Sequence, residues 1–195
     1  MNKVISGAHS DDATCLKVHV RVYAVPHPLK TGLEPLLSTT GTRSVFGLNH
    51  PFLTKLLCPS SAQKDCASNP ERTHQDLLEG KIAMTANDLL LFLWSRDTLG
   101  CNIDDENEYE DLFQGYYLER VMRHIFTGLS TALGEVLQST RPPNAILHQM
   151  TTVEAEHIAY GCLQACYAIS SWTKWAETDG TFNYHTFYYN IVNMI

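Results

Sequence analysis

Four side chains of the kinds that bind zinc recur at equal intervals in one part of the chain. They are His50, Cys58, Cys66 and His74, each eight residues after the last. Two histidines with two cysteines form a common zinc ligand set, but structural sites usually pair their ligands two to five residues apart on one turn. The wide spacing therefore argues against zinc, and we expect a buried Cys58 among solvated loop residues, with no bound metal.

A second set of reactive side chains, His157, Cys162 and Cys166, falls within one expected helix. A nucleophilic cysteine needs a base within hydrogen-bonding reach and cationic surroundings that lower its pKa. Residues five apart in a helix diverge by about 140°, so His157 is badly aimed at Cys162. We interpret the two cysteines as small buried residues at a helix crossing.

Two further patterns are weaker signals of chemistry. The acidic run at residues 104–111 has Asn107 at the position where an EF-hand loop needs glycine, which favours a solvated loop over a calcium site. No Walker A loop, Rossmann glycine pattern, GxSxG elbow or HExxH helix occurs in the sequence. The sequence therefore predicts no cofactor.

Scattered residues leave one route to an enzyme or nucleic-acid-processing factor. The side chains that such a site would have to assemble are His50, Cys58, Arg120, His124 and His148. A concave pocket that gathers them would favour this alternative.

The C-terminal part of the chain is rich in aromatic residues. Stacking sites for nucleic-acid bases come with basic grooves, and this tail offers only Lys174. Core packing with a remainder that faces a partner is the better account. The candidate interface residues are Trp172, Trp175, Tyr184, Tyr188 and Tyr189.

Length and composition predict one domain. The chain has 195 residues, of which 44% are hydrophobic and 18% charged, enough to bury a core without disulfides. It has no apolar run long enough to span a membrane and no signal peptide at residues 1–12, so we expect a cytoplasmic or nuclear protein whose six cysteines are reduced. The net charge of −7 makes nucleic acid an unlikely partner.

The element that organises the rest is expected within residues 112–137. Leu118, Val121, Met122, Ile125 and Leu129 recur at helical spacing, and Gly128 is a natural C-terminal stop.

Other elements follow from local signals. Capping boxes predict helices after Thr85, over residues 86–93, and after Thr151, the latter packing on the central helix. A short helix after Pro51 and a last helix near residues 182–192 are also expected. Residues 26–47 and 60–72 are read as loops, and residues 1–9 as disordered. After Ser10, strand-like alternation of valines conflicts with a helix N-cap signal.

Several of these motifs together resemble a known family. They are ERVMRHIFTG, LLCP after His50-Pro51, the acidic loop ahead of LFQGYYL, HQMTTVEAEHIAYGCLQACYAISS and DGTFNYHTFYYNIV. The sequence resembles an uncharacterised family of mushroom-forming fungi, domain of unknown function six six nine eight. The resemblance implies a helix opening at SDDATCLK, and it carries no known catalytic or binding residues. This chain has Gly128-Leu129 where similar sequences have Gly-Pro, which would allow the central helix to continue to Leu137.

These observations predict a mainly α fold, a single-domain irregular helical bundle with long loops over residues 10–195. The first hypothesis for function is a non-enzymatic intracellular interaction domain that acts through a protein partner or self-association. The enzyme or nucleic-acid-processing factor remains the alternative.

Overall fold

The computed structural model describes residues 3–37, 43–95, 107, 109–134, 143–147 and 149–195, and the fold over these residues is mainly helical. The helices are α1 (Lys3–Tyr23), α2 (Pro51–Leu57), α3 (Gln63–Ser68), α4 (Pro70–Leu78), α5 (Tyr116–Thr127), α6 (Asn144–Leu147), α7 (Ala155–Ile169) and α8 (Tyr184–Met194). Two short antiparallel strands, β1 (Thr178–Asp179) and β2 (Phe182–Asn183), form a hairpin before α8. The mainly α prediction is confirmed.

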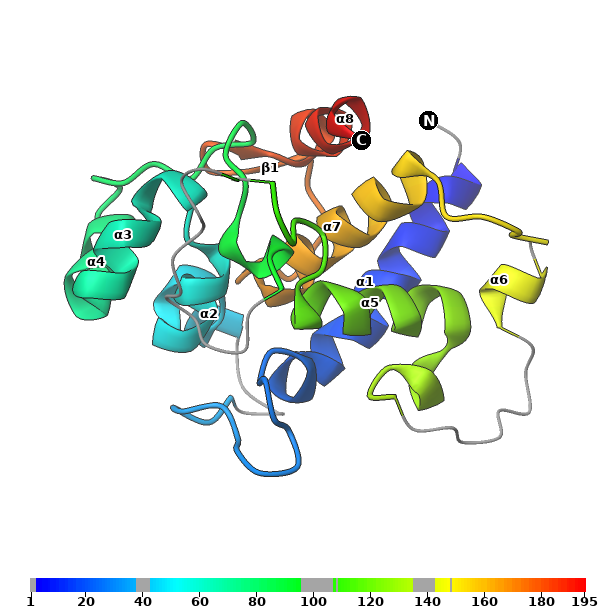
Figure 1. Cartoon of the computed structure of the whole chain (residues 1–195), viewed down its shortest axis with the longest axis horizontal. Helices are drawn as coiled ribbons and strands as arrows, with labels where there is room; N and C mark the ends of the chain where they lie inside the picture. Colours follow the sequence, from blue (N-terminus) through cyan, green and yellow to red (C-terminus); the bar gives the residue numbers. More distant parts are fainter. Residues whose placement is uncertain (1–2, 38–42, 96–106, 108, 135–142, 148) are drawn as a thin grey trace.

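Helix α7 is the centre of the core. It contacts α1, α5 and α8, and Figure 1 shows α5 crossing in front of α1 and α7 with α8 above them. Its residues from Gly161 to Ile169 are all buried, because neighbours cover it on every side. Gly161 lies against Met122 of α5, which confirms the predicted packing of these two helices.

Helices α2, α3 and α4 form a second group, at the left of Figure 1. Their own small core consists of Cys58, Ala62, Cys66 and Leu77. Backbone hydrogen bonds attach the group to the following segment, since Leu91 N donates to Cys58 O at 2.9 Å and Ser60 N donates to Leu89 O at 2.8 Å.

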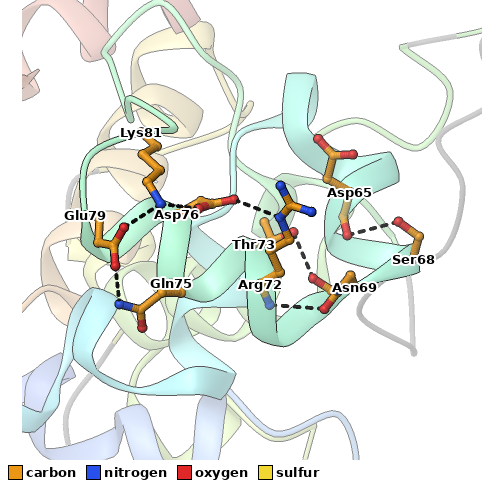
Figure 2. Close-up of polar contacts among 9 residues, drawn as sticks. All are labelled: Asp65, Ser68, Asn69, Arg72, Thr73, Gln75, Asp76, Glu79 and Lys81. Carbon is orange, nitrogen blue, oxygen red and sulfur yellow. Dashed lines mark hydrogen bonds and ion pairs between the residues drawn. The ribbon is translucent and has the colours of Figure 1, made fainter.

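The prediction of a loop at residues 60–72 is wrong. A 3₁₀ turn, Ser60–Ala62, leads into α3, and α4 begins at Pro70. Asn69 caps α4, because its side-chain oxygen accepts a hydrogen bond from Arg72 N at 3.1 Å, and proline suits the first helical position. Figure 2 shows this cap and, at the C-terminal end of α4, the ion pairs of Lys81 with Asp76 and Glu79. The segment is polar because the outer faces of its helices are exposed to solvent.

The predicted helix over residues 86–93 is also absent from the structure, although its start signal is real. Thr85 N and Oγ1 both donate to Asp88 Oδ2, at 3.1 and 2.8 Å, but they close a turn. The chain then becomes extended at Leu90, which bridges to Pro59, and makes only a 3₁₀ turn at Leu91–Leu93. Pairing with a distant segment has overridden the local helix signal.

The structure settles where three helices begin or end: the start of α1, the start of α7 and the end of α5. Helix α1 resolves the N-terminal conflict in favour of a helix, and it starts at Lys3, within the stretch expected to be disordered. Helix α7 is capped by Glu154, whose backbone N–H donates to His157 Nδ1 at 3.0 Å, so Thr151 is not the cap. Helix α5 stops at Gly128, where φ is 103° and a side chain would be strained.

Two helices and one loop region agree with the sequence predictions over the described residues. Helices α2 and α8 form where predicted, and residues 26–37 and 43–47 contain no element longer than a 3₁₀ turn.

Candidate functional site

His50 performs a structural task. Its Nδ1 accepts hydrogen bonds from Phe52 N and Leu53 N, at 3.2 and 3.3 Å, and so caps α2. Its Nε2 lies 2.7 Å from Pro35 O and therefore carries the proton. Burial lowers the pKa of His50, which keeps the ring neutral. Both ring nitrogens are thus occupied by the backbone.

Two of the four possible zinc ligands lie together. Cys58 and Cys66 are buried and share a hydrogen bond, which together with nearby Lys55 lowers the pKa of Cys66. His74 instead bonds Leu48 O through Nε2, at 2.8 Å. No group of three or more His, Cys, Asp or Glu side chains arranged to hold a metal ion is found in the described part of the chain.

Arg120 and His124 both face the C-terminal end of α1. The Arg120 guanidinium donates to the carbonyls of Tyr23, Val25 and Pro26 at 2.5–2.9 Å, where the negative end of the helix dipole favours a cation. His124 Nδ1 lies 2.9 Å from the Tyr23 hydroxyl, and burial lowers the pKa of His124 to about 4.

The four of these five residues that the structure describes occupy three different places in the fold. His50 binds the loop before α2, Cys58 pairs with Cys66, and Arg120 and His124 hold α5 on α1. His148 lies outside the described residues.

The predicted interface residues divide between surface and core. Trp172, Trp175 and Tyr189 are 41%, 38% and 50% exposed, and Tyr188 is partly buried. Tyr184 is only 2% exposed, so its inclusion as a contact residue is wrong. Its aromatic ring packs against Phe182 with centroids 5.2 Å apart and belongs to the core.

Two partly buried cations, Arg43 and Lys17, bind backbone carbonyls at the C-terminal end of α7. Arg43 Nη2 donates to Ala168 O and Ser170 O, at 2.7 and 2.6 Å. Lys17 Nζ donates to Trp172 O at 2.6 Å and lies 3.6 Å from the centroid of the Tyr167 ring. Both cations are placed where the helix dipole is negative.

Neither cation was singled out from the sequence. Burial, reinforced by nearby Arg43, lowers the pKa of Lys17 to about 7, and burial lowers the pKa of Arg43 to about 10. Each residue is more than a hundred positions from the helix end that it binds. No local pattern marks such a contact.

The two exposed tryptophans are held in place by these surroundings. Trp172 Nε1 donates a hydrogen bond to Asp179 Oδ1 of the hairpin. The Trp175 ring packs against Tyr167 and Tyr184, with centroids 4.8 and 5.3 Å apart. We call Trp172 and Trp175, with the supporting ring of Tyr167, the aromatic face.

A pocket of about 360 Å³ lies beside the aromatic face, between the α2–α4 group and the end of α7. Its polar side includes Ser170, Asp179 and Tyr184. Burial raises the pKa of Asp179, although hydrogen bonds from Trp172 and Tyr184 oppose that change. We call this the α7 pocket.

The fold and this site together define a mainly helical domain with an ordered aromatic face beside a small pocket. No helix in the described residues is both long and apolar enough to cross a bilayer. The chain belongs to a family of unknown function, DUF6698, whose model matches residues 3–195, and the predicted family resemblance is confirmed. Neither the curated proteins nor the solved structures contain a match to it.

Proposed function

We propose that the protein is a non-enzymatic interaction domain whose aromatic face binds a protein, either a partner or a second copy of the chain. The observation that carries this proposal is that Trp172 and Trp175 are 41% and 38% exposed while both side chains are held by specific contacts. Tryptophan is among the residues that contribute most to binding at protein interfaces.

The contacts beneath the aromatic face favour tight binding. A side chain that is already ordered in the free protein loses little rotational freedom on association. Trp172 is ordered by Asp179, and its backbone carbonyl is bound by Lys17. Trp175 is ordered by the rings of Tyr167 and Tyr184. The face is therefore preorganised to receive an apolar surface.

The proposal includes an intracellular place for the domain, in the cytoplasm or nucleus of a fungal cell. All five described cysteines are free thiols, which supports a reducing compartment. Four of them are buried, and burial raises the pKa of Cys162 and Cys166, so these two pack as small apolar side chains.

The alternative of an enzyme or nucleic-acid-processing factor has less support. Its candidate side chains His50, Arg120 and His124 are occupied by backbone carbonyls or by a tyrosine hydroxyl. The net charge of −7 also disfavours contact with phosphate groups.

Site-specific photo-crosslinking tests the proposal. A benzophenone amino acid replaces Lys174, which is exposed between the two tryptophans, and a matched control replaces exposed Glu71 on α4. Illumination in cells and of the purified protein should give discrete protein adducts from position 174 and none from position 71. Adducts to the chain itself identify self-association, and adducts to another protein identify a partner. Equal adduct patterns from both positions, or none from either, would overturn the proposal.

A further inference from the structure

The α7 pocket has the size of a small-molecule site. Its volume of about 360 Å³ lies within the usual range for ligand pockets, roughly 300–1,000 Å³. One wall comes from the α2–α4 group and the other from the end of α7 and the hairpin. A hydrogen bond from Thr181 Oγ1 to Met84 O, at 2.9 Å, ties the walls together.

The polar side of the pocket carries a negative charge without a matching positive one. Asp179 accepts hydrogen bonds from Trp172 Nε1 and the Tyr184 hydroxyl, which orient its carboxyl group. Among the described residues, no Lys, Arg or His lines the pocket or forms an ion pair with Asp179. Asp179 is partly buried, and a carboxylate can accept more than two hydrogen bonds, so its oxygens can receive a further donor from the pocket.

The opposite side of the pocket is apolar. Leu57, Leu77, Ile82 and Met84 line it, so it offers burial to a short hydrocarbon chain. A ligand that satisfies both sides has one cationic end and one aliphatic end. The overall charge of −7 further favours the approach of cations.

We propose that the α7 pocket binds a small organic ammonium ion, with Asp179 as its counter-charge and the apolar side of the pocket around its aliphatic part. The ammonium group donates hydrogen bonds to the carboxylate that Trp172 and Tyr184 orient. The pocket and the aromatic face are different binding surfaces. They share one contact, the hydrogen bond from Trp172 to Asp179.

Three probes that differ only in their polar end test the proposal. They are hexylammonium, hexanol and hexanoate, titrated into the full chain at pH 7 with calorimetry and with tryptophan fluorescence as readouts. We expect hexylammonium to bind about tenfold more tightly than hexanol, and hexanoate to bind most weakly. Hexylammonium affinity should also fall as the pH is lowered through the raised pKa of Asp179, because the neutral carboxyl group no longer attracts the cation.

Two variants locate the binding. Asp179→Asn should abolish the preference for hexylammonium over hexanol, whereas Asp65→Asn, at an exposed carboxylate on α3, should leave it unchanged. Ala83→Trp fills part of the pocket while keeping Asp179, and should weaken hexylammonium and hexanol together. If circular dichroism shows that Asp179→Asn does not fold, Ala83→Trp still tests whether the probes bind in the α7 pocket.

The results that contradict the proposal are equally specific. Absence of binding at 20 mM hexylammonium, roughly the weakest affinity of interest for so small a ligand, would overturn it. Equal affinity for the three probes would also overturn it, as would unchanged hexylammonium affinity in folded Asp179→Asn or in Ala83→Trp.

Discussion

Gly115 offers the sharpest test of how the segment before α5 is packed. It is the N-cap residue of α5, and its φ of −59° is one that any residue adopts, so backbone strain is not the issue. A methyl group at this position, however, would lie 1.9 Å from Phe92 O and 3.1 Å from Trp94 O. The obstacles are backbone atoms, which cannot turn aside as a flexible side chain would.

The expected effect of Gly115→Ala is a large loss of stability. Overpacking a well-filled site usually costs about 1–3 kcal/mol, and a backbone obstacle places this case at the upper end. Moving the chain apart would also weaken the hydrogen bond from Gly115 N to Leu93 O, worth about 1 kcal/mol. The lower entropy of the unfolded alanine chain offsets about 0.4–1 kcal/mol. We therefore expect the free energy of unfolding to fall by about 3 kcal/mol.

Urea denaturation followed by circular dichroism measures this change, and two other glycines provide the comparison. Gly32 has nothing within 4 Å of an added methyl group, so Gly32→Ala should be neutral or slightly stabilising. At Gly161 the methyl group would meet Met122 Sδ at 2.0 Å, and because that side chain is flexible the loss should be about 1–2 kcal/mol. A Gly115→Ala variant within about 0.5 kcal/mol of Gly32→Ala would refute the packing described here.

Three further predictions follow from buried polar groups. Replacing Arg120 with methionine should lower the free energy of unfolding by about 2–3 kcal/mol, because three backbone carbonyls lose a charged donor. The control is Arg123→Met, which removes an exposed ion pair on the same helix and should cost less than about 1 kcal/mol. Urea titration measures both changes. Because the folded-state pKa of His124 is lowered to about 4 from an ordinary 6.5, its contribution to stability is complete above pH 6.5 and lost as the pH falls toward 4. After discounting for partial exposure of the ring, this contribution amounts to about 1–2 kcal/mol. The free energy of unfolding should therefore fall less between pH 6.5 and pH 4 in His124→Gln than in the unsubstituted protein, and an equal fall in both would contradict the prediction. Iodoacetamide should alkylate exposed Cys15 quickly and Cys162 only on unfolding, since burial raises the pKa of the Cys162 thiol; equal rates by mass spectrometry would refute this.

The helices that could be predicted from the sequence are those that form from local signals within their own residues. Helix α5 has a regular apolar stripe and a glycine stop, and α7 has small residues at helical spacing, so both were found with their mutual packing. The run after Thr85 carries an equally good local signal, yet it forms an extended segment because Leu90 pairs with Pro59. Long-range pairing of this kind leaves no trace in local periodicity.

The candidate site was only partly predictable for the same reason. Trp172 and Trp175 stood out by residue type, but their order depends on Asp179, Tyr167 and Tyr184. The last of these was expected at the surface and is buried, because α8 turns its first residue toward the core. A sequence signal for the ordering existed only in the Asp-Gly turn, which places Asp179 in a hairpin.

The central claim is that the aromatic face carries protein binding, and the most direct measurement is the yield of protein adducts from the photo-crosslinker at position 174 after Trp175 is removed. Trp175→Ala should reduce that yield at least about fivefold, since a tryptophan anchor commonly contributes 1–2 kcal/mol or more to an interface. Leu29→Ala, at a leucine that is 89% exposed, provides the matched loss of apolar surface and should leave the yield unchanged. Equal yields in the two variants, with both folded by circular dichroism, would contradict the account.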